Sequence, residues 1–343
     1  MTPPSQAPHR PKPGTDDAVT RDQGPHADVI MFVEKSRWNE PVAQHAQRVA
    51  NALGGHIVLL HVLVPPHGEA TPIDPVDWDI KKQQTRNWLS GIARAFDVSG
   101  HKTESVLLEG QTIGQISAHM ARRKGAIAAA VRPSFLQDDR HSDAVSGVLA
   151  SDSNAILIIP STSTPPKEVG YRKVLLPLDG SARAESALHT AASLARAEDA
   201  ELVLCYVPPQ PGVSEFGIVD TEAAQLRKRV QNRNALAGQS HLTDVKNRLA
   251  HLRLKVSTLV VIGDDVRRAL IDTAVSQVAD IIVMATHGQS GHRDVPAGSV
   301  ASHVLDRSDI PVLMVRCDLQ PQKGHATNGV ASEGIRYPAC TNR

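Results

Sequence analysis

Short apolar runs alternate with longer amphipathic segments along most of the chain. In its second half, five runs lack a polar face, which is typical of strands covered by helices on both sides: KVLLPL (173–178), LVLCYV (202–207), TLVVIG (258–263), DIIVMA (280–285) and PVLMVR (311–316). Behind Ser181, a suitable N-cap, apolar residues recur at helical spacing: Ala184, Ala187, Leu188, Ala191, Leu194 and Ala195. The pattern predicts three further helices, over 221–252, over 265–278 with Asp264 as a candidate cap, and over 299–307.

The pattern of the second half also occurs in the first. VIMFVEKS (29–36) matches VLLPLDGS (174–181), and HIVLLHVLVPP (56–66) matches ELVLCYVPP (201–209), both at an offset of 145 residues. Later matches, VLLEG (106–110) with LVVIG (259–263) and NAILIIP (154–160) with IPVLMVR (310–316), have offsets of 153 and 156. Because strands that alternate with helices form parallel sheets, we predict an α/β fold of two tandem Rossmann-like or flavodoxin-like domains. Each is expected to be a five-stranded parallel sheet flanked by helices.

Composition sets the expected domain boundaries. Segments 1–26 and 318–343 are polar and are expected to be disordered, with domains at 27–160 and 172–317 joined by a linker at 161–171. A net charge of +1 and 3% aromatic residues argue against nucleic acid or an anionic membrane as a partner. The start of the chain has no apolar core, no run approaches the ~20 residues of a membrane span, and no CxxC pair occurs. We therefore expect a cytoplasmic protein without a disulfide framework or a metal-binding site.

The segment MATHGQSGHRDVPAGSV (284–300) carries the candidate chemistry. It lies between the fourth predicted strand and a predicted helix that begins near Ser299. The first N–H groups of a helix lack intrahelical partners and suit an anion, and Gly298 would let a phosphate approach them. Gly288 and Gly291 would let the preceding loop wrap the same group. The alternative is a flexible loop whose glycines only turn the chain, and the spacing alone does not decide between the two.

These residues resemble the universal stress protein family. Its nucleotide-binding members carry Gly-x2-Gly, nine residues, then Gly-Ser or Gly-Thr; here Gly288 is followed by nine residues and Gly298-Ser299, with Ala285 at the first glycine. The resemblance extends over 174–316 and includes PLDGS, the VPP after the second strand, VMATHG and PVLMVR. It implies an adenine nucleotide such as ATP, with or without Mg²⁺, as ligand.

The resemblance also implies roles for particular residues. Asp179 would accept a hydrogen bond from the adenine edge, although a turn or capping role is the alternative. Val207 would offer backbone groups and an apolar wall to the base. Phosphate and ribose would be held by His287 and Gly288. The remaining implied binding residues line the adenosine pocket or hold the phosphate chain: Pro177, Leu178, Met284, Ala285, Gly291, Gly298, Ser299 and Val300.

The first domain departs from this pattern. Glu34 and Lys35 stand where the second has Asp179 and Gly180, and the counterpart of ATHGQSG is approximately AVRPSFL (130–136), which has no glycine. Ser142-Asp143 replaces the Gly-Ser pair, and Pro133 has no N–H to offer. We expect a domain without a nucleotide site that pairs with the second through AILII (155–159) and PVLMV (311–315).

The sequence is compatible with three classes of function. The first is a stress-response binding or regulatory module for an adenine nucleotide, which acts on an unidentified protein partner as one chain or as a homodimer. The second is a slow ATPase or phosphotransferase, for which Asp264 and Asp265 are the candidate metal-binding carboxylates unless they cap a helix. The third is a scaffold without nucleotide. No catalytic residue is assigned, and the segment 210–220 would either cover the site as a lid or only connect.

Overall fold

The computed structural model describes residues 27–34, 40–65, 74–97, 103–123, 125–131, 155–160, 170–209, 221–263, 265–288 and 297–316. Several sequence expectations therefore lie outside the described residues. These are the two terminal segments, the candidate lid, Lys35, Pro133, Ser142-Asp143, Asp264 and Gly291.

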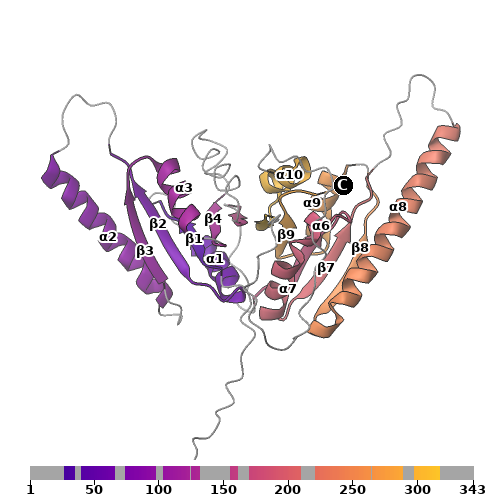
Figure 1. The fold of residues 1–343 in the computed structure, drawn as a ribbon, viewed down its shortest axis with the longest axis horizontal. Helices are drawn as coiled ribbons and strands as arrows, with labels where there is room; N and C mark the ends of the chain where they lie inside the picture. Colours follow the sequence, from indigo (N-terminus) through magenta and orange to yellow (C-terminus); the bar gives the residue numbers. More distant parts are fainter. Residues whose placement is uncertain are drawn as a thin grey trace, which may run out of the picture.

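Within these described residues, ten strands and the helices that connect most of them form two lobes (Figure 1). The first lobe contains β1 (Val29–Phe32), α1 (Glu40–Ala52), β2 (Ile57–Leu63), α2 (Pro75–Asp97), β3 (Thr103–Glu109), α3 (Thr112–Arg122), β4 (Ile127–Val131) and β5 (Ala155–Ile159). The second contains β6 (Lys173–Pro177), α6 (Ala182–Glu185), α7 (Leu188–Ala197), β7 (Glu201–Tyr206), α8 (Thr221–Arg248), η1 (Ala250–Leu252), β8 (Lys255–Val260), α9 (Val266–Ser276), β9 (Ile281–Ala285), α10 (Ser299–Arg307) and β10 (Val312–Val315).

The strands form one sheet in the order β3-β2-β1-β4-β5-β10-β9-β6-β7-β8. Within each lobe all pairs are parallel, and the strand order follows the Rossmann pattern 3-2-1-4-5. The predicted α/β fold of two tandem Rossmann-like domains is therefore confirmed. The lobes meet where β5 and β10 pair antiparallel, with Leu157 opposite Leu313. These are the two strands whose pairing the sequence predicts.

The strand register fixes how the two lobes correspond. The offsets of 145, 153 and 156 residues hold for the first, third and fifth strands, because Val29, Thr103 and Ala155 take the places of Val174, Val256 and Pro311. For the fourth strand, however, Ile127 takes the place of Ile281, an offset of 154 rather than 155. The approximate sequence alignment is thus one residue out over this strand, where Val131 rather than Ala130 takes the place of Ala285.

Apolar side chains fill both faces of the sheet. One face is covered by α1, α2, α6, α7 and α8, and the other by α3, α9 and α10, each with a core that is continuous across both lobes. The six apolar residues expected behind Ser181 are all buried. Ala184 belongs to α6, Ala187 is the N-cap of α7, and the other four lie in α7, so the stretch forms two helices rather than one. Where α6 ends, the Ser186 hydroxyl donates to Arg183 O (2.7 Å).

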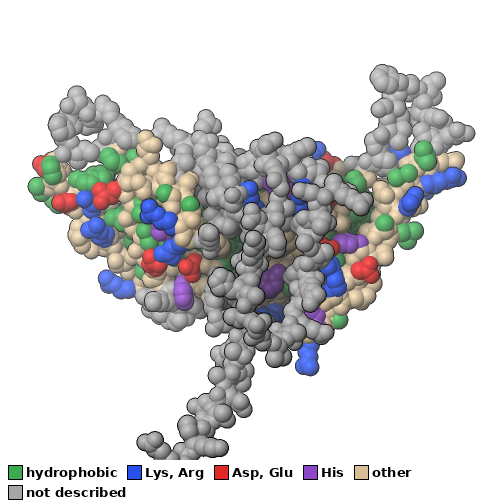
Figure 2. Space-filling model, in the orientation of Figure 1, with side chains coloured by type: hydrophobic (Ala, Val, Ile, Leu, Met, Phe, Trp, Pro, Cys, Tyr) green, Lys and Arg blue, Asp and Glu red, His purple; other side chains and the backbone are tan. Residues whose placement is uncertain are grey.

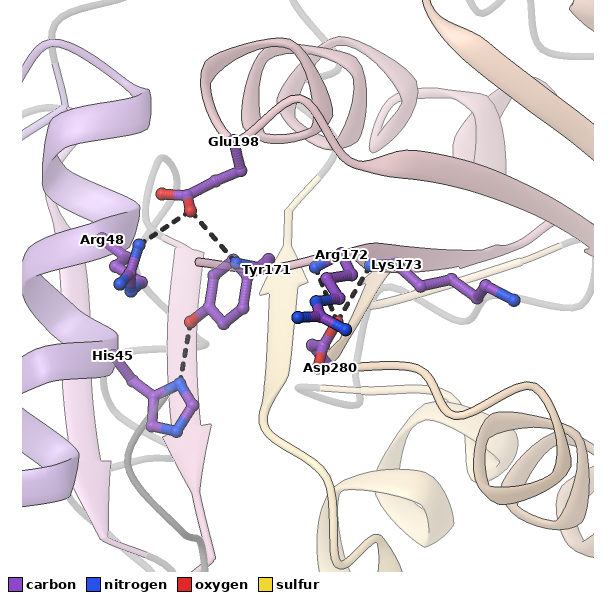
Figure 3. A network of polar contacts seen from close by, with 7 residues as sticks. All are labelled: His45, Arg48, Tyr171, Arg172, Lys173, Glu198 and Asp280. Atoms are coloured by element: carbon purple, nitrogen blue, oxygen red, sulfur yellow. Dashed lines mark hydrogen bonds and ion pairs between the residues drawn. The ribbon is translucent and has the colours of Figure 1, made fainter. Parts of the chain in front are cut away.

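Polar contacts also join the lobes beside the central strands (Figure 3). The Tyr171 hydroxyl lies 2.8 Å from His45 Nδ1 on α1, and the two side chains are 1% and 4% exposed. Arg48 Nη1 donates to Glu198 Oε2 (2.9 Å), which also accepts from Tyr171 N (3.1 Å). Gly170, at φ +95°, gives this pair room, because an added Cβ would overlap the Glu198 carboxylate. Tyr171, which the sequence assigned to the linker, is therefore a core residue.

Candidate functional site

The site lies where the strand order of the second lobe reverses. Strand β6 pairs with β7 on one side and β9 on the other, so the segments that follow these strands diverge and leave a crevice. A cavity of about 480 Å³ occupies this crevice. Its walls are Pro177, Leu178, Asp179, Ala184, Tyr206, Val207, Pro209, Val266, Leu270, Met284, Ala285, Thr286, His287, Gly288, Gly298, Ser299, Val300 and Ala301. Eleven of the twelve binding residues predicted from the sequence are among them; Gly291 lies outside the described residues.

Asp179 sits in a tight turn at the end of β6. Its Oδ1 accepts from Ser181 N (2.9 Å) and from the Ser181 hydroxyl (2.6 Å), and Ser181 Oγ in turn accepts from Ala184 N (3.1 Å). Gly180 supplies the positive φ (+83°) of the turn. The turn role and the binding role weighed for this aspartate are therefore compatible, because the side chain also forms part of the cavity wall.

Gly288 lies directly against the side chain of Asp179 in the cavity wall. A Cβ added at Gly288 would overlap the Asp179 carboxylate, so only glycine lets the loop after β9 approach the turn after β6 this closely. Gly298 differs: its φ of −67° and ψ of 158° suit any residue, and an added Cβ would lie 3.5 Å from Thr286 O. Packing therefore requires glycine at position 288 and not at position 298.

The N-terminus of α10 forms the opposite wall. The N–H of Gly298 donates to Thr286 O (2.8 Å), so this amide is not available to a phosphate. The helical ladder begins with Ser302 N donating to Gly298 O (2.9 Å), and Gly298, at the N-cap position, has no side chain to cap the helix. Within the described residues, the N–H groups of Ser299, Val300 and Ala301 have no acceptor. The available amide donors of this wall thus begin at Ser299, the first residue of the helix that the sequence predicts.

Seven wall residues were missed from the sequence: Ala184, Tyr206, Pro209, Val266, Leu270, Thr286 and Ala301. Val266 and Leu270 are spaced by four on α9, which is a signal that the sequence offers for one face of the helix. Tyr206 directly precedes Val207, and burial together with the nearby Asp179 charge raises the pKa of its phenol. Its ring packs against Gly238 of α8, where an added Cβ would overlap it.

One carboxylate proposed for metal binding is engaged elsewhere. Asp265 is the N-cap of α9, and its Oδ1 accepts from Arg267 N (2.9 Å) and Nε (3.0 Å) while Oδ2 accepts from Nη2 (2.9 Å). These bonds lower the pKa of the Asp265 carboxyl to about 2. The helix-capping alternative holds for this residue. Among the described residues, no three His, Cys, Asp or Glu side chains are grouped as a metal ion would require.

The corresponding strand ends of the first lobe are arranged differently. His61, at the position of Tyr206, has Nδ1 2.6 Å from Val33 O and meets the Trp88 ring edge-on, with ring centroids 5.6 Å apart. An imidazole that contacts the end of β1 thus stands where the second lobe has a cavity-lining phenol.

The second lobe matches the model of the universal stress protein family over residues 170–316. Universal stress protein MJ0531 of Methanocaldococcus jannaschii is 30% identical over 149 residues, which are 43% of this chain and 82% of that protein. The chain belongs to the universal stress protein family. Universal stress protein MJ0577 of the same organism is 24% identical over 157 residues, or 43% of this chain and 96% of that protein.

Both lobes have the fold of this family. The crystal structure of a universal stress protein from Archaeoglobus fulgidus covers 85% of this chain and 97% of its own, at 17% identity and a TM-score of 0.58. Because a single lobe is less than half of the chain, the likeness extends over the two-domain arrangement. In the part of this universal stress protein that the structure describes, no helix is both long and apolar enough to cross a membrane.

Proposed function

We propose that the second lobe binds one adenine nucleotide, such as ATP, in the cavity beside α10. The observation that carries the proposal is the set of three amides at Ser299, Val300 and Ala301, which have no acceptor among the described residues and border a cavity of about 480 Å³. Free N–H groups and the positive end of the helix dipole suit phosphate. The cavity volume lies in the range of roughly 300–1,000 Å³ usual for small-molecule sites.

The distribution of polarity along the cavity supports a nucleotide with its base away from α10. Val207, Leu270 and Met284 give apolar surface for a planar base, and all three are buried. Asp179 lies just after the end of β6, where its carboxylate can accept a hydrogen bond from the amino group of adenine. This assignment follows the family resemblance residue by residue.

The role we propose is binding and regulation in the stress response rather than turnover. Asp265 is engaged in capping α9 and pairing with Arg267, so it does not support a metal-assisted ATPase. For the first lobe we propose no nucleotide site, because Glu34 replaces Asp179 and the sequence over 130–136, the approximate counterpart of the glycine segment, has no glycine. The first lobe would then serve as the partner that completes the central sheet.

The test is a matched pair of substitutions at the first position of α10. Proline is tolerated at the first residue of a helix, whose N–H has no intrahelical partner, and Gly298 already has the extended backbone that a following proline requires. Ser299→Pro therefore removes one amide donor and the hydroxyl while keeping the fold. Ser299→Ala removes the hydroxyl alone. Both variants and the unchanged chain are titrated calorimetrically with ATP, and with adenosine as a ligand that lacks phosphate. The comparison separates the contribution of the Ser299 amide from that of its hydroxyl, and shows whether each acts on the phosphates.

We expect the unchanged chain to bind ATP and Ser299→Pro to bind it about 10-fold to 100-fold more weakly, the value of a hydrogen bond to a charged group. Ser299→Ala should lose less, and adenosine should respond little to either change. Absence of ATP binding at millimolar concentration would refute the proposal and favour the scaffold. ADP and phosphate release should be assayed with and without Mg²⁺. If these products form, the function is slow ATP hydrolysis rather than binding alone.

A further inference from the structure

Tyr206 is a wall residue of the cavity whose hydroxyl the proposed function leaves unused. It is the last residue of β7 and directly precedes Val207. Strand β7 pairs with β6, and Leu178 N donates to Cys205 O (2.8 Å), so the pairing continues past the end of β6. Because Asp179 directly follows Leu178, the phenol and the carboxylate stand at neighbouring strand ends in the same wall.

Helix α8 holds the Tyr206 ring from the side away from the cavity. Figure 2 shows Lys and Arg side chains on the outer surface over α8, whereas its buried residue Gly238 faces β7 and β8. A Cβ added at Gly238 would overlap three atoms of the Tyr206 ring, so only glycine lets the helix approach the phenol this closely. Glycine is unfavourable inside a helix, and this contact gives a reason for its presence here.

The Tyr206 hydroxyl is available to a ligand. Within the part of the chain that the structure describes, no hydrogen bond joins this hydroxyl to another group. Burial and the nearby negative charge of Asp179 both raise the pKa of the phenol, so the hydroxyl keeps its proton at neutral pH. A protonated phenol can both donate and accept a hydrogen bond. A half-buried hydroxyl of this kind in a cavity wall is a site for a polar group of the ligand.

The first lobe uses the same strand position differently. His61 takes the place of Tyr206, and its Nδ1 lies 2.6 Å from Val33 O while its ring meets the Trp88 ring edge-on. A side chain at this position can therefore find its polar partner within its own lobe. The second lobe instead places an unpartnered hydroxyl in the wall of a cavity.

We propose that Tyr206 is a further binding residue, whose hydroxyl oxygen accepts one N–H of the adenine amino group while Asp179 accepts the other. This contact rests on the proposed function, because it requires an adenine nucleotide in the cavity. An amino group has two donors, and the hydroxyl and the carboxylate at neighbouring strand ends offer two acceptors. A purine with a carbonyl at this position would bring a third acceptor toward the carboxylate. The pair therefore selects an amino-purine against an oxo-purine.

Two ligands that differ only in the amino group test this contact. ATP carries the amino group, and purine riboside triphosphate has a hydrogen in its place. Tyr206→Phe removes the hydroxyl and keeps the ring that packs on α8. In calorimetric titrations of the full chain, we expect this variant to bind ATP about 3-fold to 10-fold more weakly, the value of one neutral hydrogen bond. It should bind purine riboside triphosphate as tightly as the unchanged chain does, whereas a hydroxyl that only supports the fold would affect both ligands alike.

Gly238→Ala tests whether α8 positions the ring. The added Cβ displaces the Tyr206 ring, so this variant should lose at least as much ATP affinity as Tyr206→Phe. In a Tyr206→Ala background the ring is absent, and Gly238→Ala should then have no further effect on ATP binding. Gly91→Ala in α2 is the matched control, because a Cβ at this helical glycine would meet nothing within 4 Å, and ATP binding should not change.

The outcomes separate this contact from the proposed function. If the unchanged chain binds neither triphosphate, the proposed function fails and the Tyr206 contact fails with it. If the unchanged chain binds ATP, but Tyr206→Phe binds ATP equally well or loses both ligands alike, only the contact is overturned. Inosine triphosphate, which has a carbonyl at the amino position, should bind the unchanged chain more weakly than ATP. Equal binding of these two ligands would overturn the selection of an amino-purine.

Discussion

Replacing Gly288 by alanine tests how the site is built. The added Cβ would overlap the Asp179 carboxylate, so the turn after β6 or the loop after β9 has to move. Moving Asp179 breaks its two hydrogen bonds with Ser181 (2.9 and 2.6 Å). Because Asp179 is exposed and water replaces part of what is lost, we expect the free energy of unfolding to fall by about 1–2 kcal/mol.

Gly298→Ala is the matched control for this substitution. Its Cβ would meet Thr286 O at 3.5 Å and His287 Cα at 3.9 Å, which are ordinary contacts, and its φ of −67° suits alanine. The free energy of unfolding should therefore stay within about 0.5 kcal/mol or rise slightly, because alanine restricts the unfolded chain.

Urea denaturation of both variants, and of a double-mutant cycle with Asp179→Ala, measures these effects. Without the carboxylate there is nothing for the Cβ at position 288 to overlap, so Gly288→Ala should cost little in the Asp179→Ala background. Equal losses for the two glycine variants, or additive losses for Gly288→Ala and Asp179→Ala, would refute the reasoning.

Three further predictions concern other parts of the chain. Tyr171→Phe removes the buried hydrogen bond to His45 and should lower the free energy of unfolding by about 1–3 kcal/mol in urea denaturation. Burial raises the pKa of the Cys205 thiol to about 12, so the native chain should leave Cys205 unalkylated by iodoacetamide at pH 8, as peptide mass spectrometry can show, whereas the urea-unfolded chain reacts. Arg267 lowers the pKa of the Asp265 carboxyl to about 2, from about 3.8 in the unfolded chain. The ionised carboxylate therefore stabilises the fold at pH values above 3.8, and this stabilisation is lost as the pH falls through 2. Asp265→Asn should therefore lower the melting temperature at pH 7 and lose this effect at pH 2.

The strands and the start of α10 were predictable because their signals are local. Runs such as KVLLPL and DIIVMA have no polar face, and the structure buries them between helices as expected. The glycine segment predicted the start of α10 at Ser299 to the residue. Eleven residues of the cavity wall were named because the family resemblance implied them, not because the local pattern alone did.

The features that were missed depend on partners distant in sequence. Tyr171 reads as the end of a polar linker, and only its contact with His45, 126 residues away, makes it a core residue. The Gly298 amide is used by Thr286 O, which no spacing rule indicates. The one-residue error in aligning the fourth strands arose because AVRPSFL and ATHGQSG share few residues, so only hydrogen-bonded register could fix it.

The number of nucleotides bound per chain tests the account most directly. Native mass spectrometry of the full chain with excess ATP, repeated on Ser299→Pro, measures it without assuming which lobe binds. We predict one ATP per unchanged chain at saturation, and a much smaller ATP-bound fraction for Ser299→Pro than for the unchanged chain when the ATP concentration is lowered to near the dissociation constant of the unchanged chain. Two per chain would place a site in the first lobe, and one per chain undiminished in Ser299→Pro would place the nucleotide away from α10; either result contradicts the account.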